Sequence, residues 1–400
     1  MSTFAKLFVL MVLELFIWGA WFPVIFGYLP SLGFTDDQCS WTVNAFTLAS
    51  ITAMLFSAPF ADRRFAAERF LAVSHLIGGI AMIALYWVRD FETFFALLLV
   101  HSLFYVPTLS IANSVAFAHV TDPQRDFPRI RMGGTVGWIL AQFPLFFVLY
   151  GKEGLEAVPL KASVFLIAGG ASILLALFCL TLPHTPPRAT ATRPALTEVL
   201  MLLRMPFVLV LCLVTFIDAV VHQGYFVLTD RFLREGVGIA DQWVTPIMGL
   251  GQVAEISTMM VLGLVLKRLG WRATMTIGVL GHTARFAVFA YLPDHPTLVV
   301  ASILLHGICY AFFFATVYIF VDEYFPKGVR STAQGLFNFL ILGAGMYVGN
   351  VVWEKLKSAH TIDGKTDYAQ VFPVLAGTAL GGALLLALLF WPPKAVTPKT

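Results

Sequence analysis

Long apolar runs separated by short polar segments make up almost the whole chain of 400 residues. A helix needs about 20 apolar residues to cross roughly 30 Å of hydrocarbon, and runs of this length recur from one end of the chain to the other. The pattern predicts an all-α integral membrane protein with twelve transmembrane helices. Their centres are expected near Trp18, Thr52, Gly79, Phe104, Ala141, Ser172, Val214, Ala254, Gly278, Ala311, Leu342 and Leu380.

One break in composition divides the predicted helices into two sets of six. Residues 183–196 read PHTPPRATATRPAL, and this density of Pro, Thr and Arg cannot continue a helix. We therefore expect an N-terminal six-helix bundle over 1–182, a cytoplasmic linker over 183–200 and a C-terminal six-helix bundle over 201–400. Basic loops at 58–69 and 265–272 follow the second and eighth helices, and this echo favours two related, pseudo-symmetric halves.

Composition excludes a soluble protein. Hydrophobic residues form 58% of the chain and charged residues only 12%, whereas a soluble domain carries about a quarter charged residues. The net charge of +3 is too small to indicate a nucleic-acid partner. Lys and Arg concentrate in alternate connections, so the positive-inside rule places both termini in the cytoplasm. The four cysteines form no short paired motif, and we expect no metal site and no cofactor.

A carboxylate lies inside the apolar run 244–266, where Glu255 follows Gln252 by three residues. Placing a charge at the middle of a bilayer costs about 2.5–3.5 kcal/mol on insertion scales, so such a residue usually has a use. It could bind a polar solute, carry a proton or neutralise a buried cation. Arg285 is the candidate cation, because both residues lie roughly 18–20 Å along their helices from the predicted cytoplasmic face. A salt bridge between them would keep Glu255 ionised.

Other polar residues share helical faces, because residues three, four or seven apart lie on one side of a helix. These stripes mix aromatic rings with hydrogen-bonding groups, which suits a flat polar solute that contains a ring. The stripes are Glu14, Trp18 and Trp21; Arg131, Thr135 and Trp138; Asp218, His222 and Tyr225, with Gln223 beside them; Gln252 and Glu255; and Tyr310, Phe314 and Tyr318.

Histidines in the apolar runs have two interpretations. Asp218 and His222 are one helical turn apart, and this spacing is consistent with a proton-sharing pair or with a structural hydrogen bond. The single histidines of the other helices are interpreted as interhelical hydrogen-bonding groups: His75, His101, His282 and His306.

Several short segments carry a family resemblance that runs along nearly the whole chain. They are WGAWF at 18–22, YVPTL at 105–109, FPRIRMGGTVGWI at 127–139, TLPHTP at 181–186, QVAE at 252–255, ARFAVFAY at 284–291 and STAQGLF at 331–337. These segments are similar to the nucleoside:proton symporter family of bacterial permeases. That family belongs to the major facilitator superfamily. The segment APFADRR at 58–64 resembles a degraded form of the loop motif of that superfamily.

The resemblance implies a monomeric secondary transporter of the bacterial inner membrane. It would have the major facilitator fold and would import nucleosides by proton symport through alternating access. By resemblance, the solute would contact Arg131, Thr135, Trp138, Gln223, Phe226, Gln252, Glu255 and Tyr310. The candidates for proton coupling are Glu255, Asp218, His222 and Glu14.

The chain departs from the family pattern at four polar positions. Ala311 stands where nucleoside-transporting members can carry an acid, and Phe226 stands where they carry Asn. Glu14 replaces a common Gln, and Asp218 is an additional acid. These changes keep open a transporter of the same architecture for another polar solute, such as a sugar or a glycoside, with or without proton coupling. An enzyme is not predicted, because the sequence shows no nucleophile–base pair, metal-ligand cluster or phosphate loop.

Overall fold

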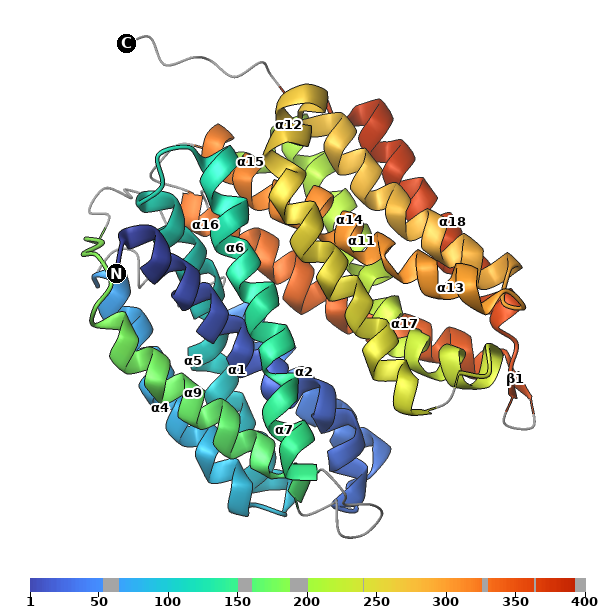
Figure 1. The fold of residues 1–400 in the computed structure, drawn as a ribbon, viewed down its shortest axis with the longest axis horizontal. Helices are drawn as coiled ribbons and strands as arrows, with labels where there is room; N and C mark the ends of the chain where they lie inside the picture. Colours follow the sequence, from blue (N-terminus) through green and yellow to red (C-terminus); the bar gives the residue numbers. More distant parts are fainter. Residues whose placement is uncertain are drawn as a thin grey trace. The chain divides into compact units, whose positions relative to one another are not determined.

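Helices dominate the computed structural model of the chain (Figure 1). The structure describes residues 1–52, 65–149, 160–187, 201–239, 241–325, 330–362 and 365–392. The helices of the first half are α1 (Thr3–Ser31), α2 (Asp36–Thr52), α4 (Ala67–Ala84), η2 (Leu85–Trp87), α5 (Phe91–Ala118), α6 (Pro123–Leu140), α7 (Gln142–Leu149) and α9 (Ser163–Cys179). Those of the second half are α11 (Pro206–Arg231), η4 (Phe232–Gly236), α12 (Asp241–Tyr291), α13 (Pro296–Ile303), α14 (Leu305–Cys309), η5 (Tyr310–Ala315), α15 (Thr316–Tyr324), α16 (Arg330–Asn338), η6 (Phe339–Gly345), α17 (Met346–Ala359) and α18 (Tyr368–Leu389).

Eight helical segments in the described part of the chain are long and apolar enough to cross a membrane. Lipid offers no hydrogen-bond partners, so a membrane-spanning chain must satisfy its backbone internally, as a helix does. The chain is a multi-pass membrane protein, as the hydropathy pattern predicts. The total of twelve helices and the sides of the termini stay predictions. The eight segments are Thr3–Ile25, Ala67–Trp87, Phe91–Ala118, Pro206–Gly236, Ile247–Tyr291, Pro296–Tyr324, Ala333–Ala359 and Tyr368–Leu389.

The long helix α12 is two helices that meet at Gly270. Its backbone there has φ 72° and ψ 177°, a conformation that favours glycine and that no helix interior adopts. The apolar part, Ile247–Tyr291, has 45 residues, about twice the length that one membrane crossing needs. Basic residues flank the break at Arg268 and Arg272. The two arms correspond to the predicted helices centred at Ala254 and Gly278.

Two later helices are interrupted by π-helical turns. The predicted tenth helix comprises α13, α14, η5 and α15, and the π-helical turn η5 begins at Tyr310. The predicted eleventh helix comprises α16, η6 and α17, and η6 is also π-helical. Such turns widen the helix and occur frequently at functional sites. One of the predicted solute-binding residues, Tyr310, therefore lies at a local irregularity of its helix.

Contacts between helices divide the chain into two compact units, each described here separately. Unit 1 comprises Met1–Asp122, Arg129–Ala195 and Gly328–Asn338. In this unit α4 packs against α5 and α9, α1 packs against α9, and α2 packs against α5 (Figure 1). The α4–α9 contact is close because it is lined by glycine: a Cβ added to Gly169 would lie 2.8 Å from the Gly79 carbonyl oxygen. Small residues at helix crossings allow such packing in membranes.

Unit 2 comprises Pro123–Pro128, Leu196–Lys327 and Phe339–Thr400. Here α12 packs against α14 and α18, and α11 packs against α17 and α18. Its core is rich in aromatic rings, and Phe232, Phe286, Phe289 and Phe372 are fully buried and in mutual contact. The predicted domain boundaries at 182 and 201 stay predictions, because residues 188–200 lie outside the described part of the chain.

A short β-hairpin follows α17, and the sequence analysis did not predict it. Strands β1 (Thr361–Ile362) and β2 (Lys365–Thr366) pair antiparallel, with Thr361 opposite Thr366. The sequence between the strands is Asp363-Gly364, a dipeptide that favours tight hairpin turns. This pair of residues lies outside the described part of the chain.

Candidate solute and proton sites

The glycines of the GGTVG segment bring α6 into backbone contact with α1 in unit 1. A Cβ added to Gly137 would lie 1.9 Å from the carbonyl oxygen of Val12, and one added to Gly133 would lie 2.6 Å from that of Phe8. No larger residue fits at either position without moving a helix. The family-like motif therefore has a packing role, which sets the position of the predicted site residues on α6.

Three predicted solute-binding residues lie on α6. Arg131 and Thr135 are buried and Trp138 is half-buried. The Trp138 ring meets the Trp18 ring edge-to-face, with centroids 5.4 Å apart. Trp18 in turn stacks on Phe46 of α2 at 5.0 Å. Trp138 thus belongs to an aromatic cluster with members on three helices, and such clusters stabilise defined ring orientations.

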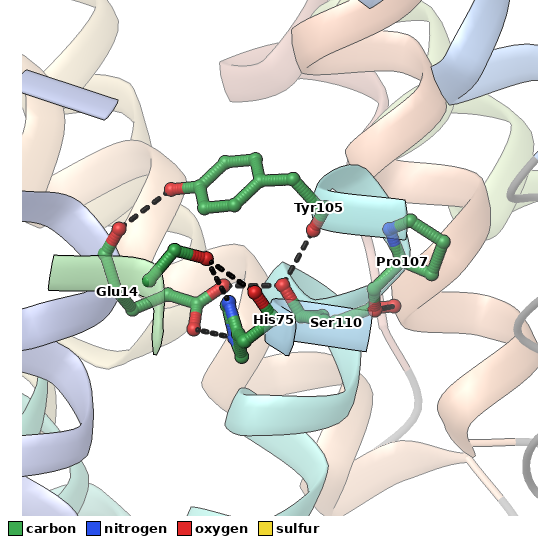
Figure 2. A network of polar contacts seen from close by, with 7 residues as sticks. Glu14, His75, Tyr105, Pro107 and Ser110 are labelled. Atoms are coloured by element: carbon green, nitrogen blue, oxygen red, sulfur yellow. Dashed lines mark hydrogen bonds and ion pairs between the residues drawn. The ribbon is translucent and has the colours of Figure 1, made fainter. Parts of the chain in front are cut away.

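The carboxylate of Glu14 is the centre of a buried polar network in unit 1 (Figure 2). The Glu14 side chain is 1% exposed. Its Oε2 atom lies 2.9 Å from Nε2 of His75 on α4, and its Oε1 atom lies 2.5 Å from the hydroxyl of Thr108 on α5. The Tyr105 hydroxyl donates a 2.6 Å hydrogen bond to the Glu14 carbonyl oxygen. The sequence analysis named Glu14 as a proton-coupling candidate but did not anticipate its partner His75.

The far side of the His75 ring contacts α9. The Ser172 hydroxyl donates to the His75 carbonyl oxygen at 2.8 Å, and it lies 3.5 Å from Nδ1 of the same residue. Nearby, Nδ1 of His101 bonds the carbonyl oxygen of Gly78 at 3.0 Å, between α5 and α4. The interpretation of His101 as an interhelical hydrogen-bonding group is therefore confirmed.

In unit 2, the cation Arg285 is fully buried. Its guanidinium lies 3.1 Å from Nδ1 of His306 and 2.9 Å from Nδ1 of His282, and it stacks over the Tyr225 ring at 4.3 Å. Arginine only donates, so both Nδ1 atoms accept, and both neutral rings carry their hydrogen on Nε2. The sequence permits an ion pair between Glu255 and Arg285. In the structure, Arg285 bonds His306 and His282 instead. The cation faces imidazoles because its side chain projects toward α14.

The acid nearest to the Arg285 cluster is Asp218 on α11. Its Oδ1 atom lies 3.7 Å from Nε2 of His282, and both residues are fully buried. His282 thus stands between the buried guanidinium of Arg285 and the buried carboxyl group of Asp218. The structure places Asp218 against His282 rather than in the proton-sharing pair with His222 that the one-turn spacing allows. The ring of His222 instead packs on His306 and His282, with centroids 5.1 and 5.4 Å away.

The predicted amides of unit 2 are held by further side chains. Gln223 donates a 2.8 Å hydrogen bond to Oδ1 of Asn350 on α17. The amide of Gln252 lies 3.4 Å from Nε2 of His306, so a chain of contacts runs from Gln252 through His306 to Arg285. The sequence analysis missed Asn350, and its only signal is a polar residue in an apolar helix.

Three further predicted residues of unit 2 differ in exposure. Glu255 is 4% exposed and Phe226 is 37% exposed. Phe226 packs its ring against His222 and Tyr225. Tyr310 contacts His222 and Phe314. Phe226 and Tyr310 therefore both contact the imidazole of His222.

The start of the linker is attached to α4 through Glu68. Its carboxylate lies 2.8 Å from Nδ1 of His184 and accepts the Thr185 backbone N–H at 3.0 Å. His119, just after α5, bonds the Thr185 hydroxyl at 2.9 Å. Burial lowers the pKa of His119, and the nearby Glu68 carboxylate opposes this only in part. These contacts give the family-like segment 181–186 a structural role.

The helical architecture and the buried polar groups define the class of protein. A solved structure of the proton:xylose symporter XylE has a TM-score of 0.77 to this chain, at 11% identity, and covers 98% of this chain and 96% of that one. At such low identity the likeness concerns the fold alone. The chain is thus a multi-pass membrane protein with the major facilitator fold.

The particular family follows from sequence comparison. The model of the nucleoside H⁺ symporter family matches residues 1–395, and the chain belongs to this family. It is 35% identical to YegT of Escherichia coli (strain K12), described as a nucleoside transporter, over 89% of this chain and 86% of YegT. It is 28% identical to the xanthosine permease of the same organism, over 98% and 96%. The crystal structure of the nucleoside transporter NupG has a TM-score of 0.72 at 25% identity, over 98% of this chain and 100% of that chain.

Proposed function

We propose that this protein imports nucleosides into the cell by proton symport, through alternating access of a solute site. Family membership supports the nucleoside as solute. The observation that supports proton coupling is the burial of acids in apolar helices, where Glu14, Asp218 and Glu255 are 1%, 0% and 4% exposed. Ionisable groups inside membrane helices commonly mark ion pathways and proton relays.

Proposed solute-binding residues are present in each unit, and they differ in kind. In unit 1, Trp138 would stack on the base, with Arg131 and Thr135 as polar neighbours on α6. In unit 2, Gln223 and Gln252 would hold the base or the ribose, and Glu255 would accept from ribose hydroxyls. Tyr310 would be the second stacking ring, and Phe226 an apolar neighbour. A desolvated nucleoside needs partners for its donors and acceptors, which amides and carboxylates provide.

The free energy released when one proton enters the cell is sufficient to accumulate the solute. A membrane potential of 100 mV supplies about 2.3 kcal/mol per charge, which corresponds to an accumulation of roughly 50-fold. We propose further that the protein works as a monomer in the bacterial inner membrane, with twelve membrane helices and with both termini in the cytoplasm.

Uptake of labelled uridine or adenosine into proteoliposomes tests this function. An inward proton gradient should raise the internal nucleoside concentration above the external one. Collapse of the gradient with a protonophore should make the internal and external concentrations equal. Uptake that does not depend on the gradient would contradict symport and would indicate facilitated transport. A Glu255→Gln variant should bind nucleoside more weakly, because the neutral amide has one acceptor oxygen in place of two charged ones.

A second solute class is motivated by the apolar ring of Phe226, which is 37% exposed, at a position where the resemblance implies an Asn. An amide lost at this position removes one donor and one acceptor for a base. Competition of nucleosides, free bases, sugars and glycosides with the uptake of labelled uridine distinguishes the two solute classes. Displacement by a sugar, with none by any nucleoside, would favour a sugar or glycoside transporter.

A further inference from the structure

Glu14 in unit 1 and Asp218 in unit 2 differ in whether a fixed positive charge lies on the other side of the histidine that each one faces. In unit 2, Asp218 faces the imidazole of His282, whose other nitrogen accepts from the Arg285 cation. An acid and a permanently charged guanidinium on either side of one neutral ring form a set with no net charge. Protonation of Asp218 would leave the Arg285 charge buried and uncompensated, which is costly in a membrane. This acid is suited to balancing Arg285.

Glu14 in unit 1 also faces a histidine, His75, but the other ring nitrogen of His75 lies near the Ser172 hydroxyl and, in the described part of the chain, not near a cation. Among the described residues, neither Oε2 of Glu14 nor Nε2 of His75 has a hydrogen-bond partner. The two atoms lie 2.9 Å apart. They are buried, at 1% and 0% side-chain exposure. A single proton placed on either atom would turn two facing acceptors into a donor and an acceptor.

The hydrogens around the pair can be counted from its contacts. The Ser172 hydroxyl hydrogen goes to the His75 carbonyl oxygen, so the Ser172 oxygen can only accept from Nδ1 of His75. A neutral His75 ring with its hydrogen on Nδ1 has a bare Nε2, and this atom faces Glu14. On the other side, Thr108 has one hydroxyl hydrogen and two acceptors at 2.5 Å, Oε1 of Glu14 and the carbonyl oxygen of Tyr105. The network therefore lacks hydrogens on both sides of the Glu14 carboxylate.

We propose that the Glu14–His75 pair binds the proton that is transported with the solute. With a neutral ring and an ionised carboxylate, the pair has a net charge of −1. It takes up one H⁺ to form either an imidazolium–carboxylate or an imidazole–carboxylic acid pair, both without net charge. The only bond that forms is N–H or O–H, and the same bond breaks on release.

The surroundings of the pair explain why the proton would be carried rather than lost. An unpaired carboxylate is unfavourable in a medium of low dielectric constant, so the occluded pair holds its proton and releases it where water can solvate the anion. The titratable groups that face it from packed elements are Tyr105 and His101 on α5 and Cys179 on α9. Arg131 on α6 acts electrostatically on Tyr105.

A path to the solute is present in α1. Trp18 follows Glu14 by one helical turn on the same face, and its ring contacts Trp138, the proposed stacking residue. A change in charge at Glu14 would alter how α1 packs on α4 and α5, and so the position of Trp18. The proton-binding role rests on the symport proposed above, and its test separates the two.

The test compares net uptake with exchange in proteoliposomes that contain Glu14→Gln, His75→Gln or wild-type protein. Exchange of labelled for unlabelled nucleoside needs no net proton movement, whereas accumulation does. We expect Glu14→Gln to retain exchange within about threefold while accumulation falls from roughly 50-fold at 100 mV to unity. His75→Gln should lose most of its accumulation as well. Glu92→Gln removes an exposed acid from the first turn of α5 and should accumulate as the wild type does.

Accumulation by Glu14→Gln at the wild-type level would overturn the assignment of the proton site while leaving symport intact. A wild type without proton-driven accumulation would instead overturn the proposed function. If both variants fail to fold, as judged by size-exclusion chromatography, infrared spectroscopy of the wild type in detergent tests the proposal. Infrared difference spectra between pH 5 and pH 9 should show, in the acidic wild type, the band of a buried protonated carboxyl group or of an imidazolium, and Glu255→Gln and Asp218→Asn should retain it. Loss of that band in either of these two variants would place the proton elsewhere.

Discussion

The side-chain amide of Gln223 donates a hydrogen bond to Oδ1 of Asn350 at 2.8 Å, from α11 to α17. Gln223 is 3% exposed, so its rotamer is constrained by packing and by this bond. A Cβ added to Gly349 would lie 2.6 Å from the Gln223 Cβ, which shows how closely α17 approaches. Asn350 is therefore a positioning residue for a proposed solute-binding amide, and the remaining groups of Gln223 keep a defined direction.

Replacement of Asn350 by Ala should weaken nucleoside binding. One hydrogen bond contributes about 1 kcal/mol, so we expect KM to rise roughly fivefold while the maximal rate changes little. Uptake kinetics measure both constants. A double variant with Gln223→Ala should bind no more weakly than Gln223→Ala alone, because the Asn350 effect acts through Gln223. Additive effects of the two changes would contradict the positioning role.

Replacement of Gly137 by Ala should destabilise unit 1. The added Cβ would lie 1.9 Å from the Val12 carbonyl oxygen, so α6 must move away from α1. Overpacking of this kind costs about 1–3 kcal/mol, and thermal unfolding in detergent should occur at a lower temperature. Gly170 on α9 is the matched control, because a Cβ there would have nothing within 4 Å. Equal melting temperatures for the two alanine variants would exclude the proposed contact.

Replacement of Arg285 by Met should destabilise unit 2 strongly, because it leaves the Asp218 charge buried without a compensating cation. Removing one member of a buried charge pair commonly costs about 3–5 kcal/mol. Asp218→Asn should also destabilise, for the opposite reason. The double variant should be more stable than the sum of the two single effects predicts, since neither charge remains. Chemical denaturation of the four proteins measures this coupling, and strict additivity would rule out charge balance through His282.

Acid should weaken the attachment of the linker through His119. The pKa of His119 is lowered in the folded protein by burial, so folding favours the neutral ring. The contribution of the neutral His119 ring to the free energy of unfolding is therefore fully present above the unfolded-state pKa of about 6.5. This contribution decreases as the pH falls below that value. Melting temperatures measured from pH 8 to pH 5 should fall less steeply in His119→Gln than in the wild type. Parallel curves would show that another group dominates in this range.

Hydropathy was sufficient to predict the eight apolar helical segments found in the described residues, because a bilayer requires a helix wherever about 20 apolar residues follow one another. The short motifs also placed the family correctly, and the GGTVG segment has a visible reason in the contact of α6 with α1. The interruption at Gly270 agrees with the expected separation of the eighth and ninth helices. These features depend on neighbouring residues in the chain, so they can be recognised without knowledge of the fold.

Partners of buried polar side chains depended on which helix faces meet, and the linear pattern does not contain that information. Depth along the helix allowed Glu255 to pair with Arg285, whereas the packing of α12 on α14 turned Arg285 to His306. Spacing joined Asp218 to His222, whereas the structure placed His282 between Asp218 and Arg285. His75 was one histidine among several until the crossing of α4 and α1 brought it to Glu14. In a membrane every long helix is apolar around most of its surface, so contacts of a few ångströms between distant segments choose the partner of each rare polar group.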